Sequence, residues 1–309
     1  MSARRWSLVA ALFTMFLWGV NFAFVKYLLD TLGVGAFLFI RFLTMPALAF
    51  LLLAFVFRRR IARTWPRRED LPRFIACGLI GHALHVGFVF WGISLSTAFS
   101  SALVLTSGPL FTLLILVLLG AERLRASQVV GTLVACVGIS LFLSEKFAGG
   151  VLHAGFGDLL LLVAAALFSL YTVLVRPLVE RYGPLIVLAY TLLFGAPPML
   201  LLSLPSMFTA QLHRLTPMVW FGLFWAIVLS SVGGWLVWTW VNHVRGIARS
   251  APLMYLPPPI AGVVAWLTLG EQFTWLKIVG AGVTMAGIAW AQFGSGRPPP
   301  REAAQVDSG

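Results

Sequence analysis

Few residues in this chain have side chains suited to chemistry, and most of those lie inside long apolar stretches. His82 and His85 stand three positions apart, so a helix would place both imidazoles on one face. Tryptophan and asparagine recur at similar spacings elsewhere, and such residues supply the aromatic walls and the few hydrogen-bonding groups of a small-molecule pocket. The predicted substrate-binding residues are Trp18, Asn21, His82, His85, Tyr171, Trp235, Trp238, Asn242 and Tyr255.

Each of these residues also has a structural alternative. Tryptophan near the end of a membrane span commonly anchors the span at the interface. The tryptophans that we interpret as anchors are Trp6, Trp65, Trp220, Trp275 and Trp290. Trp18, Trp235 and Trp238 lie deeper in their stretches, where cavity lining and packing are equally good interpretations. The two histidines could instead be packing residues that hydrogen bond to the backbone.

The sequence lacks the patterns of catalytic and metal-binding sites. No Asp or Glu falls in the middle of an apolar stretch, and no zinc-ligand spacing or nucleophile–base pair is visible. We therefore predict no catalytic residue, no metal, no cofactor and no enzymatic activity. Since membrane-buried carboxylates are the usual proton relays, their absence also weakens the alternative of a proton-coupled exporter of hydrophobic cations or drugs.

Composition places the chain in a membrane. Of its 309 residues, 60% are hydrophobic and 10% are charged, more apolar surface than a soluble protein could bury. We predict an all-α polytopic membrane protein of ten helices, each long enough to cross a hydrocarbon core of ~30 Å. The predicted spans are roughly 7–29, 35–57, 72–95, 98–119, 127–144, 157–175, 184–204, 217–240, 248–269 and 275–293.

The positive charges predict how the helices are oriented. If the N-terminus is cytoplasmic, 17 of the 22 Lys and Arg residues fall in cytoplasmic segments and 3 in outer segments. This asymmetry predicts that both termini are cytoplasmic. Because the cations sit in short loops between spans, the net charge of +12 does not indicate nucleic-acid binding. The expected partners are the lipid bilayer and a small-molecule substrate, and the sequence identifies no protein partner.

A segment around Pro109 occurs twice in the chain. A shift of 149 positions without gaps places Pro109 on Pro258 and Glu122 on Glu271, and it also aligns two pairs of glycines. We interpret this as an internal duplication of five helices. Because five is odd, the second copy crosses the membrane in the opposite sense, which predicts a five-plus-five inverted repeat of the transporter type. The predicted domains are residues 1–145 and 146–293, followed by a disordered cytoplasmic tail over 294–309.

Prolines interrupt one predicted helix in each copy. Pro109 and the run Pro257, Pro258 and Pro259 should each remove helix hydrogen bonds, and the freed carbonyls need partners within the bilayer. We predict that both helices kink against a cavity and move as gates. Simple bending for packing is the alternative, and the loss of three consecutive hydrogen bonds argues against it for the triple proline.

Charged residues at helix ends and in spans are predicted to be structural. Glu122 and Glu271 lie just before the helices at 127–144 and 275–293, where a carboxylate favours the positive helix terminus. For Lys26 and Arg41, snorkelling or pairing is expected rather than substrate contact, and Asp30 could pair with either.

These motifs resemble the EamA-type carriers of the drug/metabolite transporter superfamily. The run Trp18 to Phe22 followed by Lys26 resembles the first-helix motif of that family, and Arg41-Phe42 resembles its second-helix arginine. The further similar positions are Pro109 to Gly120, Glu122-Arg123-Leu124, Gln128, Gly131 and Gly138, with Gly270-Glu271, Gly280 and Gly287 in the second copy. The resemblance covers nearly the whole chain except the tail. One departure is the second-copy triple proline, where many members carry fewer prolines.

The resemblance implies ten helices in an inverted repeat, and export of small metabolites, often amino acids, through a cavity lined by helices 1, 3, 4, 6, 8 and 9. The aromatic-rich set is most similar to that of exporters of aromatic amino acids. We therefore expect a bacterial inner-membrane exporter of amino acids, with aromatic or large neutral ones favoured, that works by alternating access. Its aromatic residues would bind the substrate side chain, while Asn21, His82 and His85 would hold its ammonium and carboxylate groups.

Overall fold

The computed structural model describes residues 3–58, 64–120, 126–148, 152–210, 215–245 and 251–293, and every regular element within these ranges is a helix. Six segments have the length and apolar composition to cross a membrane, and four shorter apolar helices lie at the other predicted spans. The predicted all-α polytopic membrane fold is therefore confirmed. The continuous spans are α1 (Ala3–Leu32), α2 (Val34–Phe57), α7 (Ala126–Ala148), α8 (Leu152–Tyr182), α9 (Pro184–Phe208) and α14 (Trp275–Phe293).

The remaining spans are built from shorter pieces. The third span contains a π-helical segment, η3, and the eighth contains a second one, η5. The fourth and ninth spans break partway across. The third span consists of η2 (Arg68–Asp70), α3 (Leu71–Gly78), η3 (Leu79–Leu84) and α4 (His85–Leu95), and the fourth of α5 (Ala98–Leu105) and α6 (Gly108–Leu118). The eighth span consists of α10 (Pro217–Leu223), η5 (Phe224–Gly233) and α11 (Gly234–Arg245), and the ninth of η6 (Ala251–Tyr255) and α13 (Pro257–Leu269).

The irregular segments occupy matching positions in the two halves. A shift of 149 carries η3 onto residues 228–233, which lie within η5. The same shift carries the first residue of α6, Gly108, onto the first residue of α13, Pro257. Since π turns and helix breaks are uncommon in regular helices, this matching placement extends the duplication from sequence to backbone geometry.

The prolines do not act as the sequence analysis expected. Pro109 lies in the first turn of α6, and Pro257, Pro258 and Pro259 form the first turn of α13. Backbone N–H groups in a first helical turn have no intrahelical acceptor, so a proline there removes no helix hydrogen bond. The carbonyl of Leu253, four residues before Pro257, accepts the backbone N–H of Leu256 at 3.0 Å. The triple proline therefore starts a helix, and the predicted loss of three hydrogen bonds was wrong.

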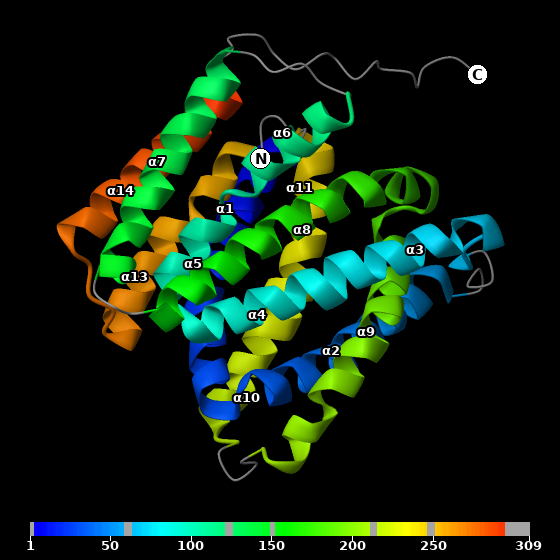
Figure 1. The fold of residues 1–309 in the computed structure, drawn as a ribbon. Coiled ribbons are helices and arrows are strands. Elements are labelled where there is room, and N and C mark those ends of the chain that lie inside the picture. Colours follow the sequence, from blue (N-terminus) through cyan, green and yellow to red (C-terminus); the bar gives the residue numbers. More distant parts are fainter. Residues whose placement is uncertain are drawn as a thin grey trace.

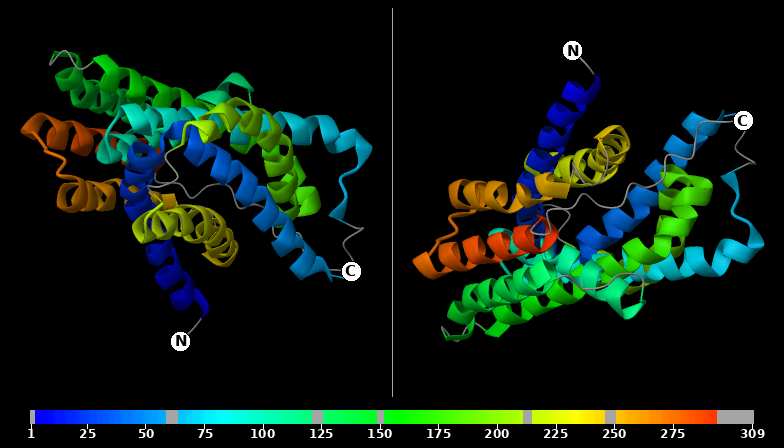
Figure 2. Two further views of the ribbon diagram at one scale, coloured as in Figure 1. Left: turned by 90° about the horizontal axis from the view of Figure 1, so that it is seen from below. Right: turned by 90° about the horizontal axis from the view of Figure 1, so that it is seen from above.

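The α7 and α14 helices pack closely side by side, as Figures 1 and 2 show. Glycine permits this approach: a Cβ atom on Gly287 would lie 2.3 Å from the backbone nitrogen of Ala135, and one on Gly131 would lie 2.2 Å from that of Ala291. Two backbones in direct contact gain dispersion energy that lipid cannot replace. The fifth and tenth spans thus form one tightly packed pair.

The rest of the bundle forms around α1, which packs against α11 and α13 of the second half. A second antiparallel pair, α2 with α9, lies on the other side of the bundle (Figure 1). Large buried side chains such as Phe37, Phe42 and Phe74 fill the space between these helices. Elements of both halves therefore surround the first helix, on which two of the predicted site residues lie. The predicted tail at 294–309 and Glu122 lie outside the described residues.

Candidate substrate site

Trp18 of α1 is held in place by the eighth span. Its indole N–H donates to the backbone carbonyl of Ser230 at 2.9 Å. Its ring meets the edge of Trp238 with a centroid separation of 5.8 Å and an interplanar angle of 62°. Gly234 makes room for the indole, since a Cβ atom there would lie 2.7 Å from the Trp18 nitrogen. Trp18 of the first half and Trp238 of the second half are therefore in direct contact.

The π-helical segment η5 provides the acceptor for this contact. The backbone N–H of Gly234 reaches back five residues to the carbonyl of Leu229, and the Ser231 hydroxyl donates to the Ala226 carbonyl at 2.7 Å. Where hydrogen bonding changes from a five-residue to a four-residue spacing, one carbonyl loses its backbone donor. The Ser230 carbonyl lies at this change, and it accepts the indole N–H of Trp18.

Asn21 lies one turn beyond Trp18 on α1. Its side-chain oxygen is buried and has no hydrogen-bond partner among the described residues. A buried amide oxygen without a donor costs free energy, so such positions call for an explanation. On the same turn as Trp18, Gly19 lies against the start of α13, where a Cβ atom would meet the Pro257 carbonyl at 3.0 Å. The helix break of the ninth span thus adjoins this part of α1.

The two histidines both have protein partners. Nε2 of His82 lies 3.1 Å from the Thr191 hydroxyl, which already donates to the Val187 carbonyl, so His82 is the donor in this contact. Nδ1 of His85 donates to the carbonyl of Ala164 at 2.9 Å. One nitrogen of each ring is therefore used to join the third span to α9 and α8. The interpretation of the histidines as packing residues thus agrees with these bonds, and only the other ring nitrogens stay available to a ligand.

Four aromatic rings line the contact between the third span and α8. His82 meets Tyr171 at a centroid distance of 5.6 Å, Tyr171 meets Phe168 at 6.2 Å, and Phe168 meets His85 at 5.1 Å. Gly81, within the π segment η3, lets Tyr171 approach, because a Cβ atom there would lie 2.3 Å from the ring. His82, His85, Phe168 and Tyr171 therefore form one continuous group of rings between the third span and α8.

Arg41 of α2 reaches the same region. Its Nη1 donates to the Ser231 hydroxyl of η5 at 3.0 Å, and its guanidinium carbon lies 5.1 Å from the centre of the Phe90 ring. Arg41 also lies within electrostatic range of His82 and His85. Asp30, which we considered as its partner, pairs with Lys26 instead at 3.2 Å, and Lys26 also donates to the Ser94 carbonyl. The prediction that Lys26 is structural agrees with these contacts.

Glu271 caps a different helix from the one we expected. Its Oε1 accepts the backbone N–H of Ala98 at 2.6 Å, so the carboxylate lies at the N-terminus of α5, with the more distant N–H of Phe99 at 3.4 Å from Oε2. The predicted assignment to the helix at 275–293 was wrong, although the residue does favour a positive helix terminus. Glu271 also lines a cavity of about 190 Å³ together with Phe99 and Lys277.

Asp158 is a buried carboxylate near the beginning of the sixth span. It has no exposed surface and accepts hydrogen bonds from the hydroxyls of Ser96 and Ser100, the latter at 2.7 Å. In the sequence, Asp158 is simply a carboxylate near the end of the predicted span at 157–175. Its complete burial could not be seen in the sequence, because it depends on the two serines at the junction of the third and fourth spans.

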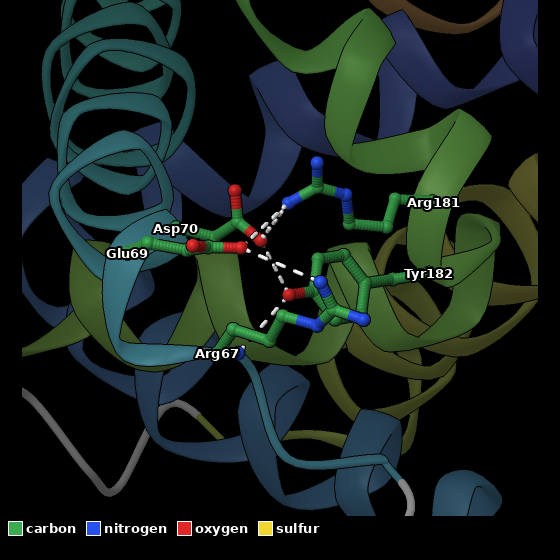
Figure 3. Close-up of polar contacts among 5 residues, drawn as sticks. All are labelled: Arg67, Glu69, Asp70, Arg181 and Tyr182. Atoms are coloured by element: carbon green, nitrogen blue, oxygen red, sulfur yellow. Dashed lines mark hydrogen bonds and ion pairs between the residues drawn. The ribbon is translucent and has the colours of Figure 1, made fainter.

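A polar cluster joins the start of the third span to the end of α8 (Figure 3). Asp70 accepts from Arg181 at 2.7 Å and from the Tyr182 hydroxyl at 2.5 Å, while Tyr182 accepts the backbone N–H of Arg67 at 3.0 Å. Arg181 also contacts Glu69 at 3.3 Å. The cluster connects segments more than a hundred positions apart, and it lies at the end of the bundle that the charge asymmetry places in the cytoplasm.

The remaining predicted site residues lie on the eighth and ninth spans and, for Pro109, on the fourth. Trp235 and Tyr255 are half-buried, and Trp235 packs against the main apolar core. Asn242 lies on α11, but its side chain falls outside the described residues, as does that of Pro109. All five tryptophans interpreted as anchors are more than half exposed, whereas Trp18 and Trp238 are half-buried. Burial thus separates the two groups of tryptophan as their positions in the spans had indicated.

Sequence reasoning did not find every residue at this site. Phe168, Thr191, Ser230 and Ser231 were not singled out, and Arg41 was set aside as structural. For Arg41 a signal was present, since it is a cation six residues inside a predicted span. For the serines there was no such signal, because every residue type has a backbone carbonyl, and the sequence does not show which carbonyl will bind a side chain.

Comparisons with known proteins identify the family of this chain. Residues 5–144 and 155–292 each match the EamA-like transporter family. The chain belongs to this family. Like its relatives, this EamA-like chain is a multi-pass membrane transporter, and the resemblance drawn from its motifs is confirmed. The family and the relatives named below are transporters rather than enzymes.

Several EamA-like relatives match along most of their length. The chain is 30% identical over 292 residues to a probable terminal-alkyne amino-acid exporter of Streptantibioticus cattleyicolor, covering 93% of each protein. It is 26% identical to a probable amino-acid metabolite efflux pump of Salmonella typhimurium, covering 92% of this chain and 94% of that one. A protein of known crystal structure shares the fold with a TM-score of 0.61 and 17% identity, over 96% of this chain and 100% of that one.

Proposed function

We propose that this EamA-like transporter exports amino acids, with aromatic or large neutral ones favoured, from the bacterial cytoplasm across the inner membrane. Two relatives with nearly full coverage are named as an amino-acid exporter and as an amino-acid metabolite efflux pump. The charge asymmetry supports cytoplasmic termini. Reporter fusions after Phe293 and within the loop before α10 test that orientation, and an active periplasmic reporter at the C-terminus would contradict it.

The observation that carries the aromatic preference is the contact between Trp18 and Trp238. The two rings come from the first helix of one half and the eighth span of the other, and the hydrogen bond to Ser230 holds the Trp18 ring in one orientation. Aromatic pairs prefer edge-to-face or offset geometry, so a substrate ring can join such a pair with favourable contacts. We propose that Trp18, Trp235, Trp238 and Tyr255 bind the substrate side chain, with Asn21 and Asn242 offering hydrogen bonds.

The proposed mechanism is alternating access. The fourth and ninth spans each break at the repeat-related start of a helix, which gives both halves a place to bend without losing helix hydrogen bonds. We propose that the segments beginning near Pro109 and at Pro257 to Pro259 move as gates while the α7–α14 pair stays packed. His82, His85 and Tyr171 would line the path between them.

Export of hydrophobic cations is the alternative, and the charges near the site disfavour it. A transporter of cations needs a carboxylate beside its substrate, as buried charges are stable only when paired. The guanidinium of Arg41 hydrogen bonds to Ser231, the residue that follows the Ser230 acceptor of Trp18. A fixed positive charge there would repel a cationic drug.

Counterflow in proteoliposomes tests this proposal. Purified protein would be reconstituted with unlabelled amino acids inside, and uptake of a labelled panel would be measured with and without a pH gradient. We expect exchange of phenylalanine, tryptophan and leucine without a gradient. Failure to exchange any amino acid, together with gradient-driven movement of cationic dyes, would replace the proposed function by the alternative.

A further inference from the structure

Arg41 presents a charge that the described protein does not neutralise. It lies within α2, well inside an apolar span, and it is half-buried. Within the described ranges its recorded contacts are the Ser231 hydroxyl and the face of Phe90, and no carboxylate pairs with it. A guanidinium has five N–H donors, and a hydroxyl and a ring face leave most of them unused.

An unpaired cation in this position is costly. Charged side chains inside membranes almost always pair with an opposite charge or face a polar cavity, and those that do not are associated with function. Two other carboxylates in or near the spans have different partners: Asp30 pairs with Lys26, and Asp158 accepts from two serines. The histidines add donors and no negative charge, since each uses a ring N–H toward the protein.

Arg41 also lies beside the residues of the proposed site. Ser231, its hydrogen-bond partner, directly follows Ser230, whose carbonyl holds the Trp18 indole. The Trp18 indole and the Arg41 guanidinium therefore hydrogen bond to adjacent residues of η5. A ligand with an aromatic ring and an anionic group could contact both at once.

We infer that Arg41 is the anchor for the carboxylate group of the transported substrate, which makes this a site for organic carboxylates with an apolar side chain. The guanidinium suits this role because its planar fork binds both oxygens of a carboxylate. The buried amide oxygen of Asn21, which has no partner in the described part of the chain, supplies an acceptor for an ammonium group on the same ligand. This inference rests on the proposed function, which makes the ligand an amino acid. It assigns binding of the substrate carboxylate to Arg41, whereas from the sequence we expected Asn21 and the histidines to bind it.

Three ligands that share a phenyl ring separate the contributions of the two polar groups. The probes are L-phenylalanine, 3-phenylpropanoate, which lacks the amine, and 2-phenylethylamine, which lacks the carboxylate. Calorimetric titration of the wild-type protein in detergent should show binding of the first two and none of the amine. Binding of the amine as tight as that of phenylalanine would overturn the inference without any variant.

The variants then locate the anchor. In Arg41→Gln, both carboxylate ligands should bind about tenfold to a hundredfold more weakly, the range expected for loss of a charge-assisted hydrogen bond. Arg41→Lys, which keeps the charge without the fork, should fall between Gln and wild type. The matched control is Arg176→Gln, because Arg176 is 68% exposed and pairs with Glu180 on the surface of α8; it should bind like wild type.

The outcomes distinguish the anchor from the proposed function. Exchange of phenylalanine at equal rates by folded Arg41→Gln and wild type would uphold the function and overturn the anchor. Binding of 3-phenylpropanoate but not phenylalanine, lost in Arg41→Gln, would support the anchor and remove amino acids as the substrate. An equal loss of binding for every ligand, with a lower unfolding temperature, would show that Arg41 is structural. If the wild type binds none of the three, both statements fail.

Discussion

The α7–α14 pair and the segmented spans use their backbones in opposite ways. In the pair, glycines at matching positions bring two regular helices into backbone contact, as at Gly131 and Gly287. In the third and eighth spans π-helical segments interrupt the regular helix, and the Ser230 carbonyl of η5 binds Trp18, while the fourth and ninth spans each break into two helices. A transporter needs both, since one part must hold the halves together while another changes shape.

The largest effect should come from filling the α7–α14 contact. Gly287→Ala would place a methyl group 2.3 Å from the backbone of Ala135, and a backbone cannot rotate away as a side chain can. We expect this overpacking to destabilise the protein by about 1–3 kcal/mol, measured as a lower thermal unfolding temperature in detergent.

Gly282 provides the matched control on the same helix. A Cβ atom there meets nothing within 4 Å, so Gly282→Ala changes helix propensity as Gly287→Ala does but fills no contact. Its unfolding temperature should equal or exceed that of the wild type. Equal unfolding temperatures for the two variants would show that the glycine contact does not stabilise the pair.

The next effect concerns the tryptophan pair. Trp18→Ala and Trp238→Ala should each slow exchange of phenylalanine by about tenfold, which corresponds to the loss of about 1.4 kcal/mol of substrate contact. Exchange would be measured per amount of folded protein. Trp220→Ala is the control, because Trp220 is 58% exposed and we interpret it as an interfacial anchor. Unchanged rates in both site variants would remove this pair from the binding site.

A smaller effect is expected at the helix cap supplied by Glu271. Because its carboxylate accepts the backbone N–H of Ala98, Glu271→Ala should lower the free energy of unfolding by about 1 kcal/mol, a typical net value for the loss of one hydrogen bond. Gln272→Ala is a suitable control, since that neighbouring side chain reaches only the Gly270 carbonyl, at 3.4 Å. If both variants unfold like the wild type, the carboxylate does not stabilise α5.

The smallest effect on stability should follow from opening the polar cluster of Figure 3. Arg181 is half-exposed, and exposed ion pairs contribute little, so Arg181→Gln should leave the unfolding temperature unchanged. If the cluster closes one end of the bundle, however, its loss should change the phenylalanine exchange rate by about twofold, through a shift between conformations. Tyr182→Phe, which removes the other bond to Asp70, should change the rate in the same direction. Opposite changes would contradict a common closing role.

Much of the architecture could be predicted from the sequence. The ten spans follow from the length and composition of the apolar stretches. These are local properties of the sequence, and they decide which segments are stable in the hydrocarbon core. The duplication was visible from Pro109 and Pro258, and the two groups of tryptophan were separable by depth. The position of the fourth- and ninth-span breaks also came from prolines, although their energetic role was misjudged because a proline inside a long apolar stretch can begin a new helix.

The pairing of polar groups was decided only by the tertiary structure. Glu271 caps a helix 173 positions away, and Lys26 rather than Arg41 takes Asp30. The sequence determined which groups needed partners, since each buried donor, acceptor or charge must be satisfied. The partner of each polar group depends on how the helices cross, and the Ser230 carbonyl can accept the Trp18 indole only once η5 has formed. For that reason the tryptophan contact and the unpaired Arg41 became visible only in the folded bundle.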